Sequence, residues 1–269
     1  MNDHPMTRMH GLLATLLALL SAGSARAHDT WVQVSGAVVR PGDVAHVDLV
    51  LGNHGNEHRD FKIAGKLSTL DGATLAVIGP DGTTTDLVPA AVDLGLAAKE
   101  GYWSARCVPE QAGLHCITHT RSGVRHGKMG FKGSKAWFLV ADRPAAVPAP
   151  SAAFREPLGH PLEFVLDTDP VLDTAAGRPI TVRLLFRGQP LAGQRVSFVP
   201  RGATLAEGFD AEHERMTDER GRCSYTPREG TLVLVVAHLV KPEEKGDGYD
   251  ATAYAATLVL DIPERSRRE

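Results

Sequence analysis

The stretch Val44-Ala45-His46-Val47-Asp48-Leu49-Val50-Leu51 carries the clearest structural signal in the chain. Ala45, Val47, Leu49 and Leu51 share one side of an extended backbone, and Val44, His46, Asp48 and Val50 share the other. This period of two predicts a β-strand with a buried aliphatic face, and it places His46 on the solvent side. The preceding Arg40-Pro41-Gly42-Asp43 has the composition of a turn.

Similar short apolar runs recur on both sides of this strand, and few segments have a helical period. Gly-, Pro- and Asp-containing turns such as Gly79-Pro80-Asp81-Gly82 separate them. Strands at this spacing without helices between them predict an all-β fold of β-sandwich type. The predicted strands are Ala73–Ile78, Tyr102–Arg106, Leu114–Thr120, Ala136–Val140, Leu162–Leu166, Ile180–Phe186, Val196–Val199, Cys223–Thr226, Leu232–His238 and Ala256–Leu260.

A shift in composition divides the chain. Residues 141–153 contain three prolines and almost no large apolar side chains, which predicts an extended linker. We therefore expect two tandem β-sandwich domains, an N-terminal one over residues 28–140 and a C-terminal one over residues 154–262.

Residues 1–27 have the pattern of a cleaved signal peptide. A basic start is followed by an apolar run from Gly11 to Ala22, too short to span a bilayer, and then by the small residues Ala25 and Ala27. We expect export, to a periplasm, of a mature chain without a transmembrane segment. Cleavage after Ala27 makes His28 the first residue, whose free amine and imidazole together can chelate a transition-metal ion.

Three further histidines are candidate metal ligands by position. His54 and His58 lie in the polar stretch Asn53–Phe61, which also holds carboxylates. This stretch is either a loop that binds a metal or another ligand, or an ordinary solvated loop. In Leu114–Thr120, strand geometry separates His115 from His119 by about 13 Å, so at most one joins a shared site, and His119 is favoured. The basic, glycine-rich Arg121–Lys135 reads as a loop, either solvated or attracting an anionic ligand.

The net charge argues against a nucleic-acid-binding protein, and the positions of the cysteines suggest one disulfide. A net charge of −3 with acids and bases interspersed leaves no basic face for nucleic acid. Cys107 and Cys116 flank a turn-like segment, so we expect a disulfide between them, with Cys223 left reduced; two buried thiols are the alternative.

Several of these segments together resemble a known family. His28-Asp29-Thr30-Trp31, the loop Asn53–Phe61, Leu158–Glu163, Thr217-Asp218 and Ala237-His238 are similar to the NikM-like, nickel-uptake-associated family of periplasmic proteins of unassigned function. The second half, with Arg187–Gly193 and Thr217–Arg222, also resembles transthyretin-like and carboxypeptidase-regulatory-like sandwiches. The resemblance implies tandem immunoglobulin-like or transthyretin-like domains and a role in divalent-metal acquisition, with His28, His54, His58 and His238 as ligands.

We therefore expect a non-catalytic protein that binds a divalent transition metal through His28, His54, His58, His119 and His238, accessory to a membrane metal-uptake system. Nickel or cobalt is favoured by the resemblance, while imidazole ligands also suit copper and zinc. One alternative is an adhesion or carbohydrate-binding module in which the histidines are incidental. Another is a copper-dependent oxidase that holds its metal with the amino-terminal histidine.

Overall fold

Strands form almost all of the regular structure in the computed structural model, which describes residues 29–52, 69–95, 101–144 and 152–268. Short 3₁₀ turns occur at η1 (Val88–Ala90) and η3 (Ala152–Arg155). Among these described residues, no helix is long and apolar enough to cross a membrane. The predicted all-β sandwich class is confirmed.

Within the described residues the strands form three sheets, one central and two flanking. The central sheet, in spatial order, contains β14 (Glu214–Met216), β13 (Arg195–Pro200), β16 (Thr231–Lys241), β17 (Ala251–Ile262), β9 (Lys128–Val140), β8 (Gly113–Arg125), β4 (Ala73–Ile78) and β5 (Thr84–Asp86), with β2 (Val38–Val39) also on β9. The first flanking sheet contains β1 (Asp29–Val34), β3 (Ala45–Gly52), β7 (Trp103–Cys107) and β6 (Val92–Asp93). The second flanking sheet contains β10 (Leu162–Leu166), β11 (Ile180–Phe186), β12 (Gln189–Pro190) and β15 (Arg222–Tyr225).

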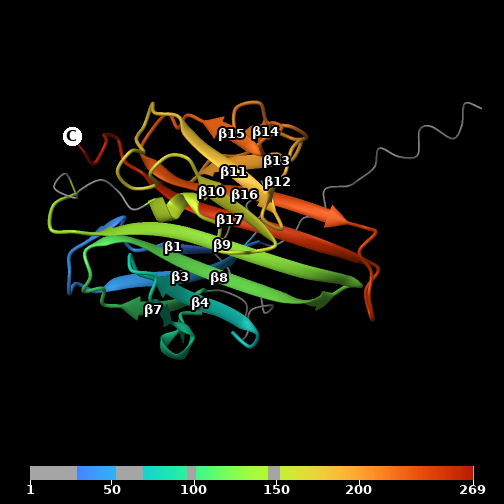
Figure 1. The fold of residues 1–269 in the computed structure, drawn as a ribbon, viewed down its shortest axis with the longest axis horizontal. Helices are drawn as coiled ribbons and strands as arrows, with labels where there is room; N and C mark the ends of the chain where they lie inside the picture. Colours follow the sequence, from blue (N-terminus) through green and yellow to red (C-terminus); the bar gives the residue numbers. More distant parts are fainter. Residues whose placement is uncertain (1–28, 53–68, 96–100, 145–151, 269) are drawn as a thin grey trace, which may run out of the picture.

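The two flanking sheets pack on opposite faces of the central sheet. On β9, Ala136, Phe138 and Val140 belong to the core beneath the first flanking sheet, while Trp137 and Leu139 belong to the core beneath the second. This explains why Ala136–Val140 is a continuous apolar run rather than an alternating one, since both of its faces are covered. In Figure 1 the long strands cross the middle of the molecule, with β10 and β11 above β17 and β3 and β7 below β9.

The halves of the chain share the central sheet. β17, from the second half, pairs in parallel with β9, from the first half, over Ala251–Val259 and Lys128–Ala136. Strand alternation in the sequence did not indicate this pairing. The boundary at residues 141–153 remains a prediction, although Ala141 at its start is buried and donates its N–H to the carbonyl of Val39.

The segment Arg121–Lys135, expected to be a loop, is instead most of a β-hairpin. β8 continues to Arg125 and β9 begins at Lys128, so only His126 and Gly127 form the turn, both with positive φ (49° and 69°). Two residues with positive φ are the signature of a type I′ hairpin turn. Gly123 pairs with Gly130 in the ladder, and two residues without side chains leave no alternating pattern to detect.

The expected disulfide between Cys107 and Cys116 is absent, and the three cysteines are free. The physical reason is that β7 and β8 do not form one hairpin. Cys107 lies in the first flanking sheet and packs against its core, whereas Cys116 lies in the central sheet and points into the core beneath the second flanking sheet. Burial raises the pKa of the Cys116 thiol to about 12, so this thiol is not a reactive thiolate.

A buried ion pair ties the two halves together across the second core. Lys135 Nζ on β9 donates to Glu163 Oε1 on β10 at 2.8 Å, and each side chain is 2% exposed. The Glu163 carboxylate also accepts the backbone N–H groups of Leu158, Gly159 and His160. Burial raises the pKa of Glu163, but the charge and hydrogen bond of Lys135 and the N–H of Leu158 outweigh it, so the net pKa is lowered.

We predict that Lys135→Met lowers the free energy of unfolding by about 3–5 kcal/mol, because it leaves a buried carboxylate without its counter-charge. Chemical denaturation measures the change. Arg228→Met is the matched control: it removes the exposed pair with Glu212, 80% and 49% exposed, and its cost is expected to be below about 1 kcal/mol. Equal effects of the two substitutions would contradict the assigned role of Lys135.

We also predict that cutting the chain at an engineered protease site within residues 141–153 leaves the two fragments associated. Two interactions would still hold the fragments together, because each joins a residue before the cut to one after it: the parallel ladder between β17 and β9 and the Lys135–Glu163 ion pair. Native size-exclusion chromatography is expected to give one peak and denaturing electrophoresis two bands. Separation of the fragments under native conditions would show that the shared sheet does not hold them.

Candidate functional site

The amino-terminal strand is held at a defined place on the central sheet. β1 is an edge strand that pairs only with β3 in its own sheet, and side chains of the central sheet satisfy its free edge. Ser134 Oγ accepts the N–H of Val32 at 2.9 Å, and Thr257 Oγ1 donates to the carbonyl of Thr30 at 2.8 Å. These contacts fix where β1 begins.

At the start of β1 the structure places Asp29 against His238. The carboxylate of Asp29 is fully buried, and its two oxygens lie 2.9 and 3.0 Å from Nε2 of His238 on β16. The charge of Asp29 raises the pKa of His238, an effect that burial partly opposes. Because a carboxylate only accepts, Nε2 carries the proton of this hydrogen bond.

Three predicted ligands, His28, His54 and His58, lie outside the described residues. Their neighbours in the chain are described: His28 is bonded to Asp29, and Asp29 pairs with Gly52, the residue just before the stretch that holds His54 and His58. Asp29 belongs to the amino-terminal motif His28-Asp29-Thr30-Trp31, but the sequence pattern alone gives it no role. A carboxylate next to the candidate His28 was the available signal.

His119 is the best-defined candidate ligand in the described residues. It lies on β8 and is fully buried, and its Nδ1 is 2.6 Å from the backbone carbonyl of Thr74. A carbonyl only accepts, so Nδ1 carries the proton of the neutral ring and Nε2 carries a lone pair. That Nε2 is a buried nitrogen without a hydrogen-bond partner.

The surroundings of His119 keep its ring neutral. Its pKa is lowered to about 4, mainly by burial; the hydrogen bond to Thr74 opposes this shift, and the nearby cations Arg121 and Lys132 contribute to it. A buried neutral imidazole with one nitrogen held by a carbonyl and the other carrying an unused lone pair has the form of a pre-oriented metal ligand.

His119 and His238 lie on the same face of the central sheet but not at one point. β9 and β17 lie between the strands of the two histidines. His119 is in register with Ser134 and Thr257, and this row of paired residues meets β16 two residues away from His238. With about 4.8 Å between strands, the Cα atoms of the two histidines are roughly 15 Å apart. The structure therefore separates two histidines that the sequence analysis had grouped, and one ion does not bind both.

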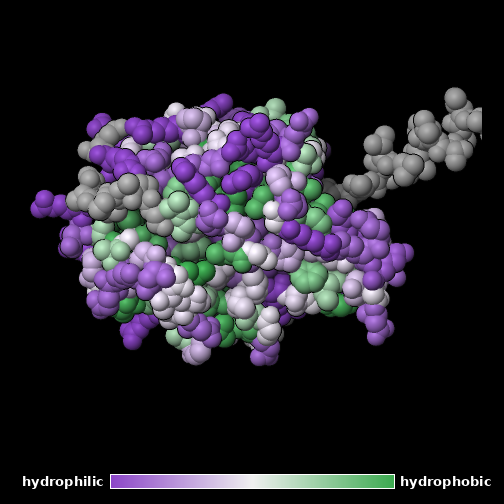
Figure 2. Space-filling model, in the orientation of Figure 1, coloured by the Kyte–Doolittle hydropathy of each residue, from purple (hydrophilic) through white to green (hydrophobic). Residues whose placement is uncertain are grey.

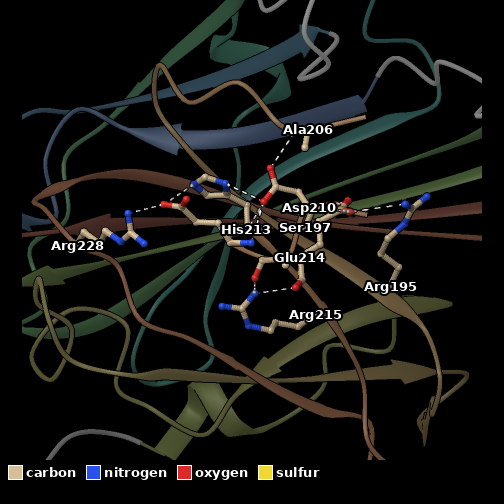
Figure 3. A network of polar contacts seen from close by, with 10 residues as sticks. Arg195, Ser197, Ala206, Asp210, His213, Glu214, Arg215 and Arg228 are labelled. Atoms are coloured by element: carbon tan, nitrogen blue, oxygen red, sulfur yellow. Dashed lines mark hydrogen bonds and ion pairs between the residues drawn. The ribbon is translucent and has the colours of Figure 1, made fainter. Parts of the chain in front are cut away.

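Another polar cluster of the described residues holds its carboxylates through internal hydrogen bonds. In the network of Figure 3, Asp210 accepts the backbone N–H groups of Ala206, Glu212 and His213, while Glu214 accepts from Ser197 Oγ and from the N–H of Asp210. The N–H of Ala206 is the main cause that lowers the pKa of Asp210 to about 2. These carboxylates organise the loop before β14, and no group of three His, Cys, Asp or Glu side chains arranged for a metal occurs among the described residues.

His115 and His46 have surroundings that do not suggest a metal ligand. His115 is buried and stacks on Phe138 with ring centroids 5.1 Å apart, consistent with the expectation that it does not join His119. His46 is exposed, as the alternation of its strand predicted. Both therefore serve as controls for His119.

We predict that His119 makes stability depend on pH. Its pKa of about 4 in the folded state is lower than the ordinary value of 6.5, so the unfolded state binds the proton more readily and stability falls as pH decreases from about 6.5 to about 4. The contribution is up to about 3 kcal/mol. Denaturation of wild type and His119→Gln across this range is expected to show the loss in wild type and a smaller loss in the variant. His46→Gln is the control, and identical profiles for wild type and His119→Gln would refute the prediction.

Comparisons with solved structures gave low-identity similarities. A methylamine-reacted α₂-macroglobulin from Salmonella is 14% identical with a TM-score of 0.27, covering 90% of this chain and 15% of that one. A DUF4785 family protein from Legionella pneumophila is 8% identical with a TM-score of 0.29, covering 77% and 52%. The Escherichia coli adhesin FdeC is 15% identical with a TM-score of 0.23, covering 88% and 65%.

The chain thus spans less than two thirds of these proteins, and similarities at these TM-scores carry no functional conclusion. No curated protein matches the sequence. The sequence model of one family matches residues 25–241, a range that includes β1, His119 and His238. The chain belongs to this family, which is described as a domain of unknown function, DUF4198.

Proposed function

We propose that this protein binds a divalent transition-metal ion, with Nε2 of His119 as a ligand. The observation that carries the proposal is the fixed tautomer of His119: Nδ1 lies 2.6 Å from the Thr74 carbonyl, and Nε2 is buried with no hydrogen bond. A buried polar atom without a partner is costly in a folded protein, and coordination of a metal removes that cost.

The donor type fits the ions proposed. Neutral imidazole nitrogen suits nickel, cobalt, copper and zinc, and a hydrogen bond from the other ring nitrogen to a carbonyl is the usual support for such a ligand. With a pKa of about 4, His119 needs no deprotonation at neutral pH before it binds. The remaining ligands are proposed from the sequence, with His54 and His58 as the first candidates.

The amino-terminal histidine provides a second possible anchor. β1 is fixed by Ser134 and Thr257, and Asp29 by His238, so the residue bonded to Asp29 has a defined attachment point. If His28 begins the mature chain, its amine and imidazole form a chelate at that point, with His238 as a further proposed ligand. Because His238 and His119 are roughly 15 Å apart, binding at this end and binding at His119 are separate events.

The biological role proposed is binding and delivery of nickel or cobalt in the periplasm, without catalysis and as an accessory to a membrane uptake system. The histidine chemistry supports binding of a transition metal, and the family resemblance favours nickel or cobalt among the four ions. The periplasmic location follows from the expected signal peptide, residues 1–27.

Titration of the chain beginning at His28 with nickel, cobalt, copper and zinc tests the proposal. We predict that His119→Gln weakens binding of the preferred ion at least about tenfold, since losing even a partner of a metal ligand typically costs about 10–100-fold. His46→Gln, an exposed histidine, is expected to bind like wild type. Calorimetry gives both affinity and stoichiometry.

A second form with one alanine added before His28 separates the two anchors. Weaker binding by this form assigns an ion to the amino-terminal end, whereas weaker binding only by His119→Gln assigns it to β8. If the wild-type chain binds none of the four ions, the proposed function is wrong and the adhesion or carbohydrate-binding alternative becomes the better one.

A further inference from the structure

β8 carries a second buried nitrogen without a hydrogen bond beside His119. Arg121 is two residues further along the strand, so both side chains leave the same face of the central sheet. Arg121 Nη1 and His119 Nε2 are both buried polar atoms with no hydrogen-bond partner. Two unsatisfied atoms at adjacent same-face positions indicate one polar site rather than two isolated defects.

The two atoms have opposite chemical requirements. Nε2 of His119 offers a lone pair, because Nδ1 holds the ring proton against the Thr74 carbonyl. The guanidinium of Arg121 offers only N–H donors and remains charged. A bare metal ion satisfies the first atom and is repelled by the second, whereas an anion alone satisfies only the second.

The charge around the site also disfavours a bare dication. Arg121 pairs in the ladder with Lys132, and both cations act on His119. Among the described carboxylates, Asp29 is committed to His238, and Asp71 beside Arg121 is exposed. A metal that arrives with its own carboxylate groups brings a net charge that this surface attracts. Figure 2 shows mainly hydrophilic residues at the projecting ends of the long strands, the region to which the β8–β9 hairpin belongs.

We propose that the site takes the metal as a complex with a small carboxylate chelator, with His119 Nε2 coordinating the metal and Arg121 binding a carboxylate of the chelator. The inference rests on the proposed function and adds the form in which the metal is bound. A guanidinium and a carboxylate form a strong charge-assisted hydrogen bond, which supplies affinity that the bare ion lacks. The chelator also supplies oxygen ligands that a single imidazole does not.

Nickel alone, citrate alone and equimolar nickel citrate are the probes. The protein is incubated with each, freed of unbound ligand by rapid gel filtration, and assayed for nickel and for labelled citrate. We predict that wild type retains nickel and citrate together in equal amounts and retains citrate only when nickel is present. Arg121→Gln is expected to lose at least about tenfold in citrate retention, the effect of removing a charged hydrogen bond, while binding nickel alone at least as well as wild type, because the substitution removes a cation that repels the bare ion.

Matched variants distinguish the outcomes. Arg106→Gln removes an exposed arginine of β7 in the other sheet and is expected to behave like wild type. Arg121→Lys keeps the charge without the planar fork and is expected to retain an intermediate amount of citrate. Thermal denaturation checks that each variant is folded.

The wild-type measurement tests the inference even where an Arg121 substitution lowers stability. If wild type binds nickel alone and added citrate strips that nickel away without being retained, the chelate inference is overturned and the metal-binding function stands. If wild type retains neither nickel nor nickel citrate, the proposed function itself fails.

Discussion

The parallel pairing of β17 with β9 is the constraint on which the rest of the structure depends. It joins strands from the two halves of the chain into one central sheet, and the two flanking sheets pack on the opposite faces of that sheet. β9 is consequently buried on both faces between Ala136 and Val140, and its residues contribute to both cores. The interface between the halves is therefore a hydrogen-bonded ladder rather than a surface contact.

The Lys135–Glu163 pair links β9 to β10 within this arrangement. Two buried charges are costly to desolvate, and a pair of apolar residues at the same positions stabilises some proteins as well or better. Here the carboxylate also receives three backbone N–H groups from Leu158, Gly159 and His160, so it fixes how the chain enters β10. The His160 ring lies against Gly133, where an added Cβ would be 2.8 Å from Nδ1, so this entry requires a glycine in β9.

The same sheet face gives its two candidate histidines, His119 and His238, different chemistry. His238 has its Nε2 on the carboxylate of Asp29, which favours the charged ring, whereas His119 has its Nδ1 on a carbonyl in a buried, positively charged setting, which favours the neutral ring. The partner of one ring nitrogen thus decides what the other can do. This difference makes His119 the stronger candidate ligand and leaves His238 tied to the position of the amino-terminal strand.

The sequence by itself determined the secondary structure class and much of its detail. Strand alternation predicted the buried face of β3 and the bounds of β4, β10 and β11, because the burial of alternate side chains is a local property that leaves a local pattern. The rise of an extended strand also predicted that His115 and His119 do not share one ion, and the choice of His119 between them stays a prediction. Where glycines removed the alternation, as at Gly123 and Gly130, the prediction of a loop was wrong.

Only the tertiary structure decided which strands pair and what each histidine touches. The β17–β9 ladder, the separate cores that Cys107 and Cys116 contact, the carbonyl of Thr74 at His119 and the carboxylate of Asp29 at His238 all depend on residues far apart in the chain. A period of two shows which side of a strand is buried, but it contains no information about the neighbouring strand. The tautomer of His119, on which the candidate site rests, is set by such a neighbour and so had no signal in the sequence.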